Sequence, residues 1–130
     1  MSMKKIIPQL QDGKYVGYRV TTMDNSSLGL RRNPFILQYP VKEWYKLPES
    51  WLVEGAGDFG GIWLSRTPSR ARHLVNYIWN TYNRQSRVYL SNIDEILFCN
   101  ANRIKTNGIY MISEMKMKLN FNGKEWVWLK

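Results

Sequence analysis

The chain has 130 residues, of which 44% are hydrophobic and 14% aromatic, the length and composition of one compact domain with its own core. Its one cysteine excludes an internal disulfide, and one cysteine with one histidine are too few for a usual zinc site. No apolar run approaches the ~18 residues of a membrane span. We therefore expect a single soluble, cytoplasmic domain over residues 1–130, with no membrane, metal or cofactor.

The first half of the chain predicts short strands. Residues 14–21 alternate between polar and apolar side chains and are rich in β-forming residues. Further candidates lie at 35–39, 51–54 and 62–65, and Pro40 limits the first of these to an edge or an end. These segments predict a sheet that begins before any helix does.

One helix is predicted over about residues 68–84. Thr67 is a good N-cap, and Pro68 suits the first helical position because its missing N–H would be unpaired there in any case. Apolar residues at helical spacing predict a buried stripe, formed by Ala71, Leu74, Val75, Ile78 and Tyr82. The opposite, polar face carries Arg70, His73, Tyr77, Asn80 and Arg84. That face either leans on a ligand or simply meets water.

The second half returns to strands, at 87–90, 96–98 and 108–113. Residues 115–121 alternate with period two, and Asn122-Gly123 is the strongest two-residue hairpin signal before the apolar run 126–129. The fold class expected is therefore α+β, a mostly antiparallel sheet with one main helix and a C-terminal β-hairpin.

Charge is the first positive indication of function. Nineteen Lys and Arg against ten Asp and Glu give a net charge of +9, which suits an anionic partner. Between Asp58 and Asp94 there is no acidic residue but five arginines, whose planar fork fits phosphate. The alternative is a solvated surface that keeps the protein soluble.

Residues 55–60 match the letters of GxGxxG. The dinucleotide-binding fingerprint needs a strand before the glycines and a helix after them, whereas here a predicted strand follows. We therefore expect a turn, or a glycine loop beside a binding site, and no Rossmann fold.

Two loops supply candidate phosphate ligands. Arg31, before the strand at 35–39, either holds a phosphate or is a surface residue. Residues 100–107 hold three amides and two cations, Arg103 and Lys105, which can grip phosphate and read a base edge. Aromatic candidates for stacking on a base are Tyr77, Tyr82, Trp63 and Phe98, each of which can equally belong to the core.

An enzymatic alternative rests on three separated segments. Arg19, Ser65-Arg66-Thr67 and Glu114 are similar in order to the Arg, Ser-x-Thr and Glu of ADP-ribosyltransferases, which act on NAD. The second acid or glutamine that those enzymes carry two residues before the glutamate is replaced here by Ile112.

A broader resemblance runs over most of residues 14–114. The order of residues 17–21, 28–34, 60–63 and 103–106 (GYRVT, LGLRRNP, GGIW and RIKT) resembles the first Thoeris anti-defence family of phage proteins. Members of that family sequester glycocyclic ADP-ribose signals without degrading them, act as dimers or larger oligomers, and in some cases also hold cyclic oligonucleotides. The tail 116–130 lies beyond the similar part.

The resemblance implies specific roles for residues of this chain. Arg31 and Arg103 would hold phosphate, Tyr77 or Tyr82 would stack on adenine, Asn92 would add a polar contact, and neighbouring protomers would close the pocket. We therefore expect a non-enzymatic, homo-oligomeric (dimeric or hexameric) protein that sequesters a cyclic nucleotide signal in the host cytoplasm, with no catalytic residues. A small basic nucleic-acid-binding protein and the ADP-ribosyltransferase-like enzyme remain the alternatives.

Overall fold

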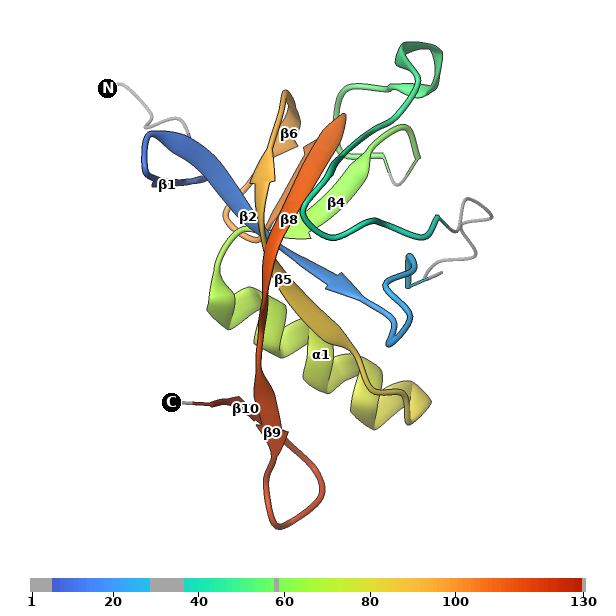
Figure 1. Ribbon diagram of the computed structural model, residues 1–130. Helices are drawn as coiled ribbons and strands as arrows, with labels where there is room; N and C mark the ends of the chain where they lie inside the picture. The colour runs from blue at the N-terminus through green and yellow to red at the C-terminus, as the bar shows by residue number, and fades with distance from the viewer. Residues whose placement is uncertain (1–5, 29–36, 58, 130) are drawn as a thin grey trace, which may run out of the picture.

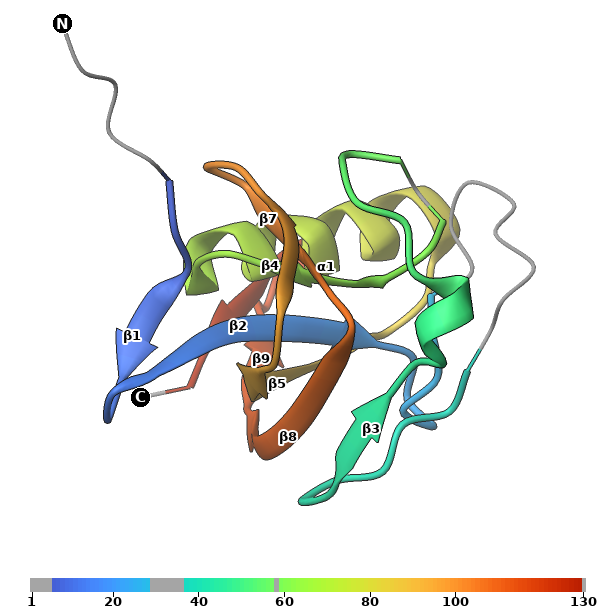
Figure 2. The same ribbon diagram turned by 90° about the horizontal axis from the view of Figure 1, so that it is seen from above.

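The computed structural model describes residues 6–28, 37–57 and 59–129. Its strands form one large antiparallel sheet in the order β3-β8-β5-β2-β4-β7-β6, with β1 paired to β2 (Figures 1 and 2). The strands of this sheet are β1 (Gln9–Gln11), β2 (Lys14–Thr21), β3 (Trp44–Lys46), β4 (Ile62–Ser65), β5 (Arg87–Ile93), β6 (Ile96–Cys99), β7 (Arg103–Thr106) and β8 (Gly108–Met115). The predicted α+β class is confirmed.

Helix α1 (Pro68–Tyr82) follows β4 and lies along one side of the sheet. The Thr67 side chain accepts a hydrogen bond from the Arg70 N–H, and the helix ends at Tyr82, followed by the C-cap Asn83 in a left-handed conformation with φ 54°. The predicted helix is therefore confirmed, although it ends two residues before position 84.

The C-terminal hairpin is a separate two-stranded sheet made of β9 (Met117–Leu119) and β10 (Trp126–Trp128). It continues from β8 and folds back beside α1, where Figure 1 shows it below the main sheet. Gly123 takes φ +71° in the turn, but the strands end at Leu119 and begin again at Trp126, so the hairpin is confirmed while its turn is longer than the predicted two residues.

Two hydrophobic clusters pack on opposite faces of the sheet. One lies between the sheet and α1 and includes Tyr18, Val20 and Val75. The other covers the opposite face and includes Ile62, Ile104 and Met111. Because side chains alternate along a strand, β2, β5 and β8 each contribute to both clusters.

Several predictions about local structure are wrong. Residues 51–54 form no strand, since Glu49–Trp51 is a short 3-10 helix followed by extended loop. The polar segment 100–107 is only partly a loop, because Arg103–Thr106 forms β7. Tyr82 is 49% exposed, so only Ala71, Leu74, Val75 and Ile78 of the predicted stripe pack inward. Of residues 35–39, the described part makes one isolated bridge, from Gln38 to Ser26.

Within the described ranges, no helix has both the length and the apolar character needed to cross a membrane.

Candidate functional site

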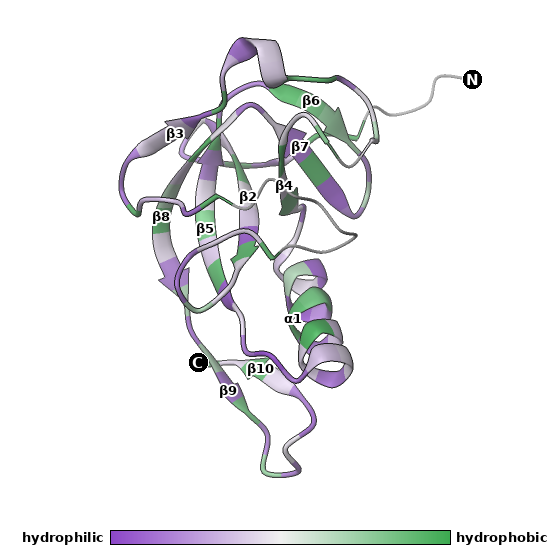
Figure 3. Cartoon of the chain, turned by 90° about the vertical axis from the view of Figure 1, so that its right-hand side faces the viewer, coloured by the Kyte–Doolittle hydropathy of each residue, from purple (hydrophilic) through white to green (hydrophobic). Residues whose placement is uncertain are grey.

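Trp63 is the centre of a cationic–aromatic cluster on β4 and β7. It pairs across the strands with Lys105, and Ser65 pairs with Arg103. Paired residues share a face, so Trp63, Arg103 and Lys105 lie on the same side of the sheet. The Arg103 guanidinium carbon lies 4.0 Å from the centroid of the Trp63 ring, and the Lys105 ammonium lies 5.7 Å from it. Figure 3 shows both hydrophilic (purple) and hydrophobic (green) segments along β7.

A glycine-rich loop, described at residues 52–57 and 59–61, adjoins this cluster. Lys105 is fully buried, and its Nζ donates to the Gly55 carbonyl oxygen at 3.2 Å. A Cβ added at Gly61 would stand 2.5 Å from Lys105 Cγ, so glycine is required for the lysine stem to pass. The glycines that match the dinucleotide fingerprint therefore belong to a loop that packs against a buried lysine, and the expected strand, β4, follows this loop.

Arg103 differs from Lys105 in its exposure. Its side chain is only partly buried, and Nη2 donates to the Ala56 carbonyl oxygen over 3.4 Å. A guanidinium held over an indole ring is fixed in orientation by a cation–π contact. Such a group offers donors for a phosphate and a flat surface on which a purine can stack.

Two of the amides in the predicted donor-rich segment are used inside the fold. Asn100 Oδ1 accepts from the N–H groups of Asn102 and Arg103, which closes the turn before β7. Asn107 Oδ1 accepts from the Glu95 N–H, and its Nδ2 donates to Asp94. These amides shape turns, so the segment contributes fewer ligand donors than its composition indicates.

A second cation, Arg19, lies on the opposite side of the same strand pair. Its side chain is only 7% exposed, and Nη1 donates to the main-chain oxygen of Trp63 at 2.6 Å. Nη2 approaches Ser27 Oγ at 3.4 Å, and the guanidinium carbon lies 4.7 Å from the Tyr39 ring centroid. Among the described residues, no carboxylate forms an ion pair with Arg19.

The residues of the ADP-ribosyltransferase comparison do not meet on one face. Arg19 pairs with Tyr89, which pairs with Glu114, so these three share a face. Ser65 pairs with Tyr18 and so belongs to the other face. Glu114 Oε1 also lies 3.1 Å from Lys116 Nζ and 3.8 Å from Arg87 Nη1.

The structure separates the other predicted ligand residues from Arg103 and Lys105. Tyr77 and Tyr82 are ten and fifteen residues along the helix from Thr67, or about 15 and 22 Å at the helical rise. Asn92 lies on β5, three strands from β7, or about 14 Å away. Arg31 lies outside the described residues. Of the predicted set, the structure thus brings together Arg103 and Lys105.

Asn92 belongs to a different surface. It pairs with Tyr110 of β8, which in turn pairs with Trp44 of the edge strand β3. The rings of Trp44 and Tyr110 are 5.7 Å apart, and Trp44 is 47% exposed. This grouping joins residues 44, 92 and 110, and no local signal in the sequence indicates it.

One thiol, that of Cys99, lies near the cluster, and its surroundings change its pKa. Cys99 follows Phe98 in β6, and Phe98 pairs with Lys105 and meets the Trp63 ring edge-on at 6.0 Å. Burial raises the pKa of the Cys99 thiol, an effect that nearby Arg66 opposes. The thiol therefore stays protonated at neutral pH.

Comparisons of this chain with protein-family models, with curated proteins and with solved structures find no match. Within the described ranges, no group of three or more His, Cys, Asp or Glu side chains is placed to hold a metal ion. The resemblance to the Thoeris anti-defence family therefore stays a prediction, and the site is interpreted from its own geometry.

Proposed function

We propose that the protein binds a small phosphate-bearing nucleotide and sequesters it unchanged. The observation that carries this proposal is the Arg103 guanidinium, held 4.0 Å from the Trp63 ring centroid on a partly exposed face beside the glycine loop. A fixed arginine next to an aromatic ring combines a phosphate donor with a surface for a base. The net charge of +9 adds long-range attraction for an anion.

The ligand class that we propose is a cyclic nucleotide signal such as glycocyclic ADP-ribose, with cyclic oligonucleotides as a second possible cargo. Such a ligand carries phosphates, a purine and riboses, and so matches arginine, amide and aromatic groups. The sequence resemblance supports this class, and the anti-defence role in the cytoplasm of an infected cell is part of the same proposal. Nanomolar capture needs about −12 kcal/mol, which several charge-assisted hydrogen bonds in an enclosed site can supply.

The separation of the predicted residues bears on the assembly. Tyr77 and Tyr82 lie about 15 Å or more from the position at which α1 begins, close to Arg103. A small ligand that contacts both a tyrosine and Arg103 would therefore have to lie between two copies of the chain. The homo-oligomer, a dimer or hexamer, is therefore part of the proposal through the sequence resemblance, which assigns the stacking role to these tyrosines.

Native mass spectrometry tests the proposal. Purified protein is mixed with cyclic ADP-ribose isomers, cyclic oligonucleotides and NAD, and bound species are identified before and after release by heat. We expect the wild-type chain and the control Arg84→Ala to retain one unmodified cyclic nucleotide. Arg103→Ala should lose it while its circular dichroism spectrum is unchanged.

A second variant separates binding from folding. Arg103→Lys keeps the positive charge over Trp63 but removes the planar fork, so it should fold normally and bind more weakly than wild type. Wild-type affinity in Arg103→Ala would contradict the proposed site. Cleavage of NAD with release of nicotinamide would instead indicate the ADP-ribosyltransferase-like enzyme.

A further inference from the structure

The outward face of α1 is a basic strip without acidic residues. Arg70, His73, Tyr77 and Asn80 are all exposed and recur every three or four residues, which places them in one line along the helix. The only other arginine of the helix, Arg72, is bound by Glu125 of the hairpin. No described residue between Phe59 and Ile93 is acidic, so nothing in this stretch neutralises the strip.

Two tyrosines add exposed aromatic surface to the helix: Tyr77 within this strip, and Tyr82 at the last residue of the helix. Tyr77 and Tyr82 are each 49% exposed, and their rings meet edge to face with centroids 6.1 Å apart. A hydrogen bond with Tyr77 raises the pKa of Tyr82, while the charge of Arg84 acts in the opposite direction. Arg84 is exposed and lies two residues after Tyr82, the last residue of the helix, so it extends the basic strip beyond the helix.

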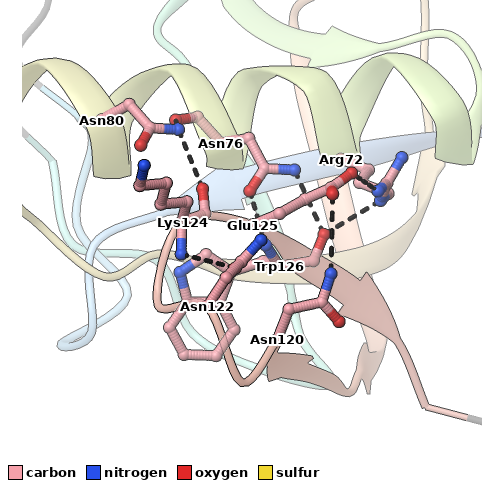
Figure 4. A network of polar contacts seen from close by, with 8 residues as sticks. All are labelled: Arg72, Asn76, Asn80, Asn120, Asn122, Lys124, Glu125 and Trp126. Atoms are coloured by element: carbon pink, nitrogen blue, oxygen red, sulfur yellow. Dashed lines mark hydrogen bonds and ion pairs between the residues drawn. The ribbon is translucent and has the colours of Figure 1, made fainter.

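The C-terminal hairpin is fixed against the same part of α1. Asn80 Nδ2 donates to the Lys124 carbonyl oxygen at 3.1 Å, and Trp79 Nε1 donates to the Gly123 carbonyl oxygen at 2.9 Å. Asn76 makes hydrogen bonds to both the N–H and the carbonyl of Trp126, at 2.6 and 3.1 Å (Figure 4). These contacts hold the turn of the hairpin beside the basic strip.

The turn that is held in this way presents a fully exposed aromatic ring. Phe121 has a relative exposure of 105%, and the neighbouring Lys124 is also exposed. A phenylalanine in this position contributes nothing to the two hydrophobic clusters. Phe121 therefore offers, on an anchored turn, an exposed ring on which a planar base can stack.

We infer that these residues form a binding surface for single-stranded nucleic acid. The α1–hairpin surface comprises Arg70, His73, Tyr77, Tyr82, Arg84, Phe121 and Lys124. Cations that follow the phosphates, interleaved with aromatic rings on which bases stack, are what a single strand requires. A duplex would hide its bases from Tyr77 and Phe121. An acidic protein would use the cations but would leave the exposed aromatic rings without a role.

The dimensions agree with a strand of several nucleotides. Arg70 and Asn80 are ten residues apart on the helix, or about 15 Å. A stacked strand advances about 3.4 Å per nucleotide, so the helical part alone spans roughly four of them. Within one chain the surface is separate from the Arg103–Trp63 cluster, although the proposed oligomer would share Tyr77 or Tyr82 between the two, and the inference goes beyond the nucleotide-capture function.

Fluorescence anisotropy with labelled 12-nucleotide oligo-dT, oligo-U and a mixed-sequence duplex tests the inference. We expect both single strands to bind more tightly than the duplex, with affinity that falls steeply with salt. The double variant Arg70→Ala/Arg84→Ala should reduce the slope of log K against log salt by about 1.4, or about 0.7 for each phosphate contact. Tyr77→Ala and Phe121→Ala should each weaken binding roughly 5- to 150-fold with little change in that slope.

Matched controls decide whether this surface is specific. Arg70→Ala and Lys14→Ala each remove one exposed cation, but Lys14 lies on β2 away from the surface. Equal losses in these two variants would overturn the inference, because binding would then follow net charge alone. Equal affinity for the duplex, or no effect of Tyr77→Ala and Phe121→Ala, would overturn it as well.

One more variant separates this surface from the nucleotide site. Arg103→Ala should abolish nucleotide capture and leave oligonucleotide binding within about twofold of wild type. Arg70→Ala/Arg84→Ala should do the reverse. Loss of oligonucleotide binding in Arg103→Ala at wild-type stability would assign the nucleic acid to the Arg103 site and overturn the inference, whereas loss of nucleotide capture alone would leave it intact.

Discussion

Arg19 donates a 2.6 Å hydrogen bond from its Nη1 to the main-chain oxygen of Trp63 and so joins strands β2 and β4 beyond their one paired position. The register pairs β2 with β4 only at Tyr18 and Ser65, so the sheet ladder is short at this position. The buried guanidinium supplies the missing contact from the opposite side of the sheet to the Trp63 ring. Trp63 is thus positioned by one arginine through its backbone and lies against another, Arg103, through its side chain.

Replacement of Arg19 should destabilise the fold. Arg19→Ala removes the hydrogen bond to the Trp63 carbonyl and opens space beside Tyr39, and we expect a loss of about 2–4 kcal/mol in the free energy of unfolding. Arg19→Met keeps most of the packing and should lose less. Urea denaturation followed by tryptophan fluorescence measures both, and exposed Arg70→Ala, expected within about 0.5 kcal/mol of wild type, is the control.

Gly61 should tolerate no side chain. Gly61→Ala would put a methyl group 2.5 Å from Lys105 Cγ, and the lysine cannot withdraw easily because it is buried and bound to Gly55. We expect a loss of about 1–3 kcal/mol from this overpacking. Gly57→Ala in the same loop has no atom within 4 Å of the new methyl group and should be neutral in thermal unfolding. Equal melting temperatures of the two variants would refute the role of the Gly61–Lys105 contact.

Asn76 should govern the docking of the hairpin. Asn76→Ala removes both hydrogen bonds to Trp126 and should lower the free energy of unfolding by about 1–3 kcal/mol. Faster hydrogen exchange at residues 117–128, with the main sheet unchanged, is the expected signature. Asn80→Ala removes hydrogen bonds to Asn76 and to Lys124 that are exposed to solvent, so it should cost less and serves as the milder comparison.

Cys99 should react slowly with thiol reagents in the folded protein. Because burial raises the pKa of its thiol, the thiolate fraction at pH 8 is lower than that of an unfolded cysteine. The rate of modification by a disulfide reagent should rise with pH through a midpoint above that of a free cysteine, and urea should remove the difference. An unshifted midpoint in native protein would contradict this expectation.

Local signals in the sequence predicted those elements whose structure depends on neighbouring residues. Thr67 and Pro68 mark the start of α1 through capping chemistry, and Asn122-Gly123 marks the place of the hairpin, although its turn is longer than two residues. Residues 51–54 carry strand-forming side chains but lie exposed in a loop. Their strand propensity agrees with the extended backbone of the loop, but they form no strand because no neighbouring strand pairs with them.

The candidate site was only partly predictable because it depends on register. Arg103 and Lys105 were identified from their donor groups, but their strand pairs with β4 about forty residues earlier in the chain. A polar segment usually indicates an exposed loop, and lysine is rarely buried. Strand β7 was therefore missed, because its Lys105 is fully buried. The roles of Trp63 as a partner of Arg103 and of Arg19 as a buried strut likewise arise from cross-strand contacts that no local pattern encodes.

The way in which α1 holds the hairpin has a consequence for the variation that the chain can accept. Trp79, Asn80 and Asn76 contact main-chain atoms of the hairpin, so the helix recognises the path of its backbone rather than the identity of residues 122–124. Substitutions in that turn can therefore accumulate without loss of docking, provided that the turn keeps its shape. The tip of the hairpin is a position at which a new recognition sequence can be grafted, or evolve, on an unaltered scaffold.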